Sequence, residues 1–158
     1  MGVTAVAVAA VVGGCGGTST LHTAKIAQAI EATILTQYGV QTTVTCPTTV
    51  PEKAGYHFAC VAGLTVGAYP MNVIEHGTDG RVSYTGAAPL QVLNSKAIET
   101  AIAAAMRKHH LKATVSCPQP VLQASGLSFA CTATYKKGAA VFTVTETDGD
   151  GHVQFVED

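Results

Sequence analysis

Five cysteines are the residues of this chain whose type and spacing suggest a chemistry. Four of them form two pairs, Cys46 with Cys60 and Cys117 with Cys131, and both pairs have the spacing Cys-x13-Cys. A zinc site would need Cys-x2-Cys or nearby paired histidines, and neither is present. In a small exported domain such pairs form disulfides, so we expect the local bonds Cys46–Cys60 and Cys117–Cys131. Pairing between the two sets is the alternative, and it would leave each half of the chain without its own covalent link.

The segments around the cysteines repeat 71 residues apart, without a gap. Val44-Thr45-Cys46-Pro47 returns as Val115-Ser116-Cys117-Pro118, and Phe58-Ala59-Cys60 returns as Phe129-Ala130-Cys131. This predicts two tandem modules, at residues 23–86 and 94–158, joined by a linker at 87–93. A unit this small buries little apolar surface. Closing its loop with a disulfide stabilises it by roughly 3 kcal/mol in the chain-entropy model.

Each module begins with a helical pattern, in which aliphatic residues recur every fourth position. The two stripes are Ile26, Ile30 and Ile34, and Ile98, Ile102 and Met106. Thr23 is the expected N-cap of the first helix, and Gly39 its C′ residue. Asn94 or Ser95 is expected to cap the second helix. The second stripe is offset by one residue from the 71-residue repeat, which predicts a slightly different rotation of that helix.

After each helix the apolar period changes to two, the period of β-strands. Glycines and two Asp-Gly pairs separate the strands as turn residues. Pro47 and Pro118 lack an N–H and are expected to end the first strand of each module. The predicted fold class is therefore α+β, with two tandem repeats. Each repeat has one helix, a four-stranded antiparallel sheet and one disulfide.

The fifth cysteine, Cys15, follows a leader at residues 1–14 that has no charged side chain. An apolar run at residues 5–12 suits the central region of a signal peptide and is too short to span a bilayer. Val12-Gly13-Gly14-Cys15 resembles a bacterial lipobox, which implies lipidation of Cys15. Residues 15–22 then form a flexible tether. A signal peptide normally begins with Lys or Arg, which residues 1–4 lack, so an upstream start codon stays open.

The Thr-Cys-Pro strand end, the Phe-x-Cys strand and the late Asp-Gly hairpin resemble a domain of unknown function. That domain is common in actinobacterial lipoproteins and membrane proteins, especially mycobacterial ones. Both copies have the pattern, although Ser116 replaces Thr45 in the second. The resemblance implies an exported protein, anchored by lipid to the extracytoplasmic side of the cell membrane. The family has no established chemistry, so the resemblance bears on location and fold and not on activity.

No sequence motif indicates catalysis, a cofactor or a metal centre. A G-x-S-x-G elbow and a phosphate-binding loop are both missing, and six histidines are scattered along the chain. Asp148-Gly149-Asp150-Gly151 lacks the further ligands of a calcium loop and is better explained as a hairpin turn. The net charge of −1, without a basic block, argues against nucleic-acid binding.

Together these features predict a non-catalytic cell-envelope lipoprotein. Its modules would bind or scaffold an envelope protein, a lipid or a wall polymer. Two small basic groups, Arg107-Lys108 with Lys112 and Lys136-Lys137, are expected to be solvated surface. The alternative is a secreted enzyme inhibitor that acts through its sheet face. That alternative depends only on an architectural likeness to tandem-repeat β-lactamase inhibitor proteins.

Overall fold

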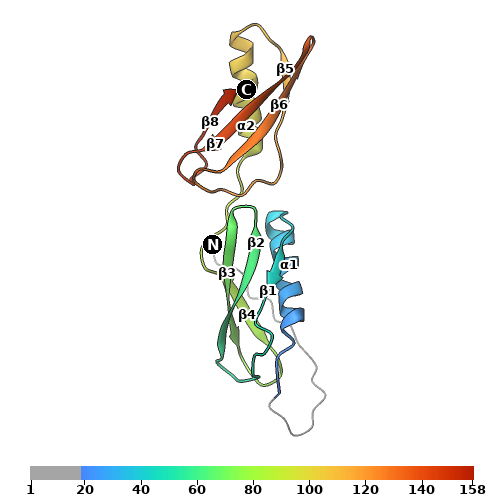
Figure 1. Cartoon of the computed structure of the whole chain (residues 1–158), viewed down its shortest axis with the longest axis vertical. Coiled ribbons are helices and arrows are strands. Elements are labelled where there is room, and N and C mark those ends of the chain that lie inside the picture. The colour runs from blue at the N-terminus through green and yellow to red at the C-terminus, as the bar shows by residue number, and fades with distance from the viewer. Residues whose placement is uncertain (1–18) are drawn as a thin grey trace. The chain divides into compact units, whose positions relative to one another are not determined.

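The computed structural model describes residues 19–158, which form two compact units divided between Pro89 and Leu90. Each unit consists of one helix followed by a four-stranded antiparallel sheet (Figure 1). Each unit also contains one disulfide. The predicted α+β fold class is therefore confirmed. The leader at 1–14 and the predicted lipidation site Cys15 lie outside the described residues.

The two units have the same order of elements and the same strand order. Unit 1 contains α1 (Thr23–Tyr38), β1 (Thr43–Thr45), β2 (His57–Leu64), β3 (Gly67–Glu75) and β4 (Val82–Gly86). Unit 2 contains α2 (Ser95–Lys108), β5 (Ala113–Ser116), β6 (Ser128–Tyr135), β7 (Gly138–Glu146) and β8 (Val153–Glu157). Each sheet is a meander in which consecutive strands are neighbours, in the orders β1-β2-β3-β4 and β5-β6-β7-β8.

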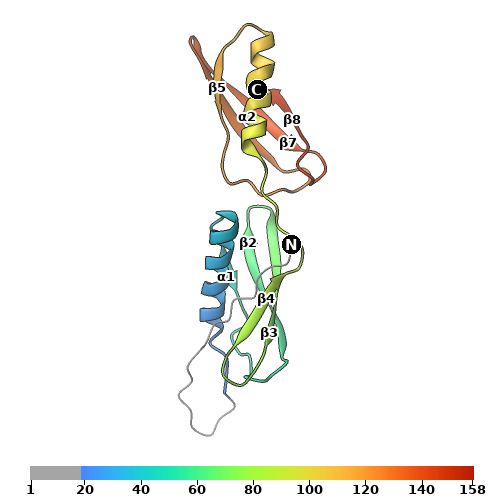
Figure 2. The same ribbon diagram turned by 180° about the vertical axis from the view of Figure 1, so that it is seen from behind.

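The helix of each unit lies against one face of its own sheet (Figures 1 and 2). The buried stripes of the two helices place the core between helix and sheet. All six residues of the two predicted stripes are buried. In unit 2 the stripe joins a single apolar cluster with residues of β5, β6 and β7. Its buried members are Ile98, Ile102, Met106, Val115, Cys117, Cys131, Ala133, Phe142 and Val144.

The helix ends agree with the sequence in part. Asn94 caps α2, since its side chain accepts a hydrogen bond from the Ala97 N–H, and Gly39 ends α1 in the left-handed conformation. The prediction that Thr23 is an N-cap is wrong. His22 occupies that position without a side-chain cap, and Thr23 is already the first helical residue. The Thr23 hydroxyl is therefore not the acceptor that a cap requires.

The one-residue offset of the second stripe places its last residue one position nearer to the equivalent residue of the first strand of the sheet. Ile34 is ten positions before Val44, whereas Met106 is nine positions before Val115. The chain turns at the left-handed residue Gly39 in unit 1 and at His110, with φ of 61°, in unit 2. Counted from the last residue of the stripe, the chain of unit 2 therefore turns one residue earlier. Its first strand nevertheless pairs with the second in the same register as in unit 1.

In both units, the residues just before the helix pair with the loop that follows the first strand. Leu21 donates its N–H to Val50 O and Glu52 donates to Ser19 O, with an antiparallel bridge between Thr20 and Pro51. Unit 2 repeats this bridge between Val92 and Leu122. Residues 19–21, predicted as tether, and residues 91–93, predicted as linker, are thus paired with the loop that follows each first strand.

Candidate functional site

Each disulfide connects the first strand of its unit to the second, at the position next to the last backbone pair of β1 with β2 or of β5 with β6. Because Thr45 is opposite Val61, Cys46 comes opposite Cys60, and their Cα atoms are 4.2 Å apart. Cys117 and Cys131 have the same relation, with Cα atoms 4.3 Å apart. Both bonds are local to one unit, as predicted, so the alternative of pairing between units is wrong. Such bonds persist in oxidising compartments.

Each helix also fixes the short first strand through a carboxylate. Glu31 of α1 accepts a 2.8 Å hydrogen bond from the Val44 N–H. Glu99 of α2 accepts one of 3.1 Å from the Cys117 N–H. This backbone N–H, and after it Lys96 at 3.3 Å, lower the pKa of Glu99 below its usual value, because both favour the ionised carboxylate. The edge strand that bears the first cysteine is thereby tied to the helix.

A buried carboxylate at the end of the third strand was missed by the sequence analysis. Glu75 ends β3 and Glu146 ends β7, and both are completely inaccessible to solvent. They are equivalent positions of the repeat. A signal was available, because both have the inward parity of their strands, two residues after Val73 and Val144. A charge buried at an inward position must be compensated by hydrogen bonds or by an opposite charge.

In unit 2 that compensation is complete. Glu146 Oε2 accepts a hydrogen bond of 2.6 Å from the Ala124 N–H, and Oε1 accepts one of 3.0 Å from the Gly151 N–H. The side chain thus links the loop before β6 to the loop between β7 and β8. In unit 1 only half of the arrangement is present. Glu75 Oε2 accepts from the Lys53 N–H at 2.8 Å, and Oε1 is buried without a partner.

The sheet face that points away from each helix is solvent-facing and has no charged residue at its strand positions; we name it the outer face. In unit 1 it consists of Thr43, Thr45, His57, Ala59, Val61, Gly63, Ala68, Pro70, Asn72, Ile74, Ser83 and Thr85. In unit 2 it consists of Thr114, Ser116, Ser128, Ala130, Thr132, Thr134, Ala139, Val141, Thr143, Thr145, Gln154 and Val156. Small hydroxyl-bearing and apolar side chains therefore dominate both outer faces.

Apolar side chains occupy the middle of each outer face. Val61 is 41% exposed and is paired across the strands with Pro70. Val141 is 42% exposed and is paired with Thr132, and Val156 on the edge strand β8 is 68% exposed. Soluble sheet proteins usually place charges on such faces and edges to prevent association. Their absence here marks the outer faces as candidate binding surfaces.

Among residues 19–158, no group of three or more His, Cys, Asp and Glu side chains converges as a metal site. The Asp148 loop is a hairpin turn, as predicted. Asp148 accepts a hydrogen bond from the Asp150 N–H and pairs with His152 Nδ1 at 2.5 Å. The Asp150 N–H, followed by His152, lowers the pKa of Asp148. His57, one of the scattered histidines, is exposed on β2.

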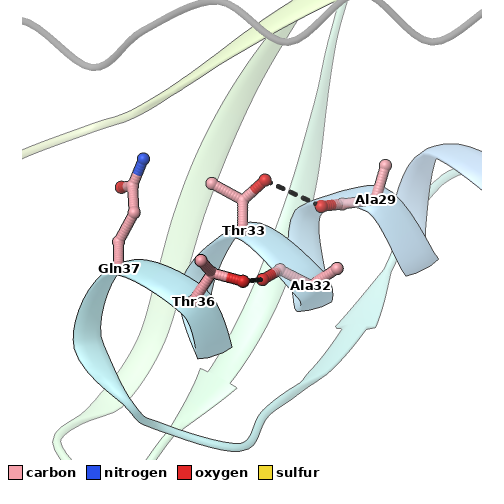
Figure 3. Close-up of a pocket in the computed structure, with 5 residues that line it drawn as sticks. All are labelled: Ala29, Ala32, Thr33, Thr36 and Gln37. Carbon is pink, nitrogen blue, oxygen red and sulfur yellow. Dashed lines mark hydrogen bonds between the residues drawn. The ribbon is translucent and has the colours of Figure 1, made fainter.

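One surface pocket has a volume of about 400 Å³ and runs along a flank of α1 formed by Ala29, Ala32, Thr33, Thr36 and Gln37 (Figure 3). The hydroxyls of Thr33 and Thr36 donate back to the carbonyls of Ala29 and Ala32, so this flank presents mainly methyl groups.

A second pocket is in unit 2, beside Met106 and Phe142, and has a volume of about 130 Å³. In unit 1 the corresponding space is filled by Tyr69, whose ring lies over Gly86 so closely that a Cβ on Gly86 would collide with it. Unit 2 has Ala140 and Glu157 at the equivalent positions. The pocket therefore lies where unit 1 has an aromatic ring, and His109 and Glu157 are the ionisable side chains among the residues that line it.

No described helix is long and apolar enough to cross a membrane. Comparison of the chain with models of protein families, with curated proteins and with solved structures finds no match in any of the three.

Proposed function

We propose that the protein is a non-catalytic lipoprotein of the cell envelope, anchored through Cys15, and that its outer faces bind an envelope protein. The lipobox-like Val12-Gly13-Gly14-Cys15 and the family resemblance of both modules support the anchor. The two disulfides support an oxidising compartment, because thiols stay reduced in the cytosol. The observation that carries the binding function is the uncharged outer face repeated in both units.

A protein partner fits the outer faces better than a polymer or a lipid. They have no Trp, Tyr or Phe on which a sugar ring could stack. The pocket of unit 2, at about 130 Å³, is smaller than the ~300–1,000 Å³ of typical small-molecule sites, and the pocket of about 400 Å³ lies on an open flank of α1 without a charged side chain. A flat surface of Thr, Ser, Ala and Val side chains instead suits packing against another uncharged protein surface, where no charge must be desolvated.

The anchor is tested with the variant Cys15→Ser in a host that processes lipoproteins. The substitution removes the thiol that would receive the lipid, so we expect the protein to move from the membrane fraction to the soluble fraction. Incorporation of a labelled fatty acid should be lost in parallel. The matched control is the wild-type chain with its four paired cysteines intact. Unchanged fractionation and unchanged labelling of the variant would refute the anchor.

The binding surface is tested by placing a photo-crosslinking amino acid at Val61 or Val141 in the native envelope. We expect one discrete protein adduct from these positions. The helix position Thr100, which is also exposed, serves as the control and should give none. In a chain with the probe at position 61, the additional substitution Val141→Lys lies in the other unit. It should leave the adduct from position 61 intact if the two outer faces bind independently.

The same substitution should weaken binding at the face of unit 2 itself. A lysine buried in the contact would lack a partner, so the adduct from a probe at Thr132 should fall at least ~10-fold. The fold should be unaffected, because exposed substitutions usually change stability by less than about 0.5 kcal/mol. Equal adducts from Thr100 and from the outer faces, or adducts that contain only lipid or glycan, would refute a protein partner.

A further inference from the structure

Unit 1 has two carboxylates at a place where unit 2 has one. Glu52 and Glu75 of unit 1 correspond to Gln123 and Glu146 of unit 2. In unit 2 the Gln123 side chain lies beside Gly151, where a Cβ would stand 2.9 Å from Gln123 Nε2. The same Gly151 donates its N–H to Glu146. The repeat therefore places the side chain of Glu52 beside Glu75, with an additional negative charge.

The pairing of residues 19–21 with the loop at 50–52 places a third oxygen, the Ser19 hydroxyl, on the same side as Glu52. Because Thr20 is bridged to Pro51 and the Glu52 N–H donates to Ser19 O at 2.8 Å, Ser19 is directly opposite Glu52. Residues opposite each other in an antiparallel pair have Cβ atoms about 4.5–5.5 Å apart. Leu21, two residues from Ser19, and Val50, two residues from Glu52, are both buried. Ser19 and Glu52 therefore share the inward side of the pairing.

Three oxygens of this group are buried without a hydrogen-bond partner: Ser19 Oγ, Glu52 Oε1 and Glu75 Oε1. The Glu75 side chain is completely buried, and only its Oε2 is satisfied, by the Lys53 N–H. Among residues 19–158, no Lys, Arg or His forms an ion pair with Glu52 or Glu75. In unit 2, Gln123 Oε1 is also unpartnered, but its amide is neutral, and both oxygens of Glu146 are satisfied.

We propose that Ser19, Glu52 and Glu75 bind Ca²⁺ at this end of unit 1. Two carboxylates neutralise a divalent cation, and a set of ligands made only of oxygen suits a hard cation and not zinc or copper. Ca²⁺ fits better than Mg²⁺, since it accepts irregular geometry and Mg²⁺ demands a near-ideal octahedron. The remaining ligands would be water and backbone carbonyls. A site with two carboxylates matches the affinity of extracellular modules, with Kd of about 10⁻⁴–10⁻³ M.

The site has a structural consequence. It would join residues 19–21, the loop at 50–53 and the end of β3. In unit 2 the equivalent loop and strand end are joined without a metal, through the hydrogen bond from the Ala124 N–H to Glu146. Calcium would then order the start of unit 1, close to the point where the chain leaves the predicted lipid anchor. The proposal is independent of the binding surface proposed for the outer faces.

The test is a calcium titration of the oxidised full chain, observed by the amide resonances in ¹H–¹⁵N NMR. We expect saturable shifts of Ser19, Glu52 and Lys53 with a midpoint of about 0.1–1 mM. The equivalent amides of unit 2, Gln123 and Ala124, provide an internal control and should not move. The same concentrations of Mg²⁺ should produce much smaller shifts. The melting temperature of unit 1 should increase by about 6–20 °C in 10 mM Ca²⁺.

The variant Glu52→Gln introduces the residue of the second repeat. It should abolish the calcium response, and it should be at least as stable as the metal-free wild type, since an amide can donate to Glu75. Absent or non-saturable shifts up to 10 mM Ca²⁺ would overturn the proposal, as would equal shifts in both units. A third result would also overturn it. If Glu52→Gln stabilises unit 1 while Ca²⁺ has no effect on the wild type, the two carboxylates repel each other without binding a metal.

Discussion

The double variant Cys117→Ala/Cys131→Ala will lose most of the stability of unit 2 and leave unit 1 folded. The bond closes a loop with a sequence separation of 14 between strands β5 and β6. Losing a native disulfide from a small exported domain costs about 2–5 kcal/mol. The units have small cores, with a single helix against a single sheet, and domains of this size have little stability to spare.

Hydrogen exchange followed by mass spectrometry resolves the effect by unit. Peptides from β6 and β7 should lose protection, while those from β2 and β3 should keep it. The matched variant Cys46→Ala/Cys60→Ala should reverse the pattern, because the bond of unit 1 is equally local. Two double variants with unchanged protection, or a loss that always appears in the other unit, would contradict a separate covalent link in each module.

The second large effect concerns the buried carboxylate of unit 2. Glu146→Gln keeps the shape of the side chain but replaces one oxygen with an NH₂ group. That group would face the N–H of Ala124 or of Gly151, so one hydrogen bond is lost and a buried donor is left unsatisfied. We expect a loss of about 2–4 kcal/mol in the free energy of unfolding of unit 2, measured by urea titration.

The control is the equivalent substitution in unit 1. Glu75 uses only Oε2 for a hydrogen bond, so the amide of Glu75→Gln can place its oxygen toward the Lys53 N–H and its NH₂ toward the unpartnered oxygens. In metal-free buffer this variant should change stability by less than about 1 kcal/mol. If Glu146→Gln costs no more than Glu75→Gln, the hydrogen bonds of Glu146 are not what stabilises the two loops of unit 2.

Much of the fold could be predicted from the residues, because the helical stripe, the strand alternation and the cysteine spacing each occur in both halves of the sequence. The aliphatic stripes beginning at Ile26 and Ile98 are buried as expected, and the cysteines pair within their own units. Periodicity and spacing involve residues close together in the sequence, so they predict helices, strands and local disulfides without knowledge of distant contacts. The same holds for Asn94, whose side chain reaches a backbone N–H three residues away.

Features that depend on distant partners could not be predicted in this way. The N-cap of α1 shifts to His22 because Leu21 is held by Val50, which fixes where the helix begins. In the sequence Glu75 and Glu146 look like ordinary strand-end carboxylates. The N–H groups of Lys53 and Ala124 that they bind come from loops 22 residues earlier. The outer faces could be deduced from strand parity, but their lack of charge gains meaning only once the helix is known to cover the other face.

The central claim is a duplicated module with its own disulfide in each copy, located where thiols oxidise. It is tested most directly by peptide mapping of unreduced protein purified from the native envelope. We predict linked peptides that contain Cys46 with Cys60 and Cys117 with Cys131, and no free thiol at these four positions. Free thiols at these positions, or a peptide that links Cys46 to Cys117 or Cys131, would contradict it.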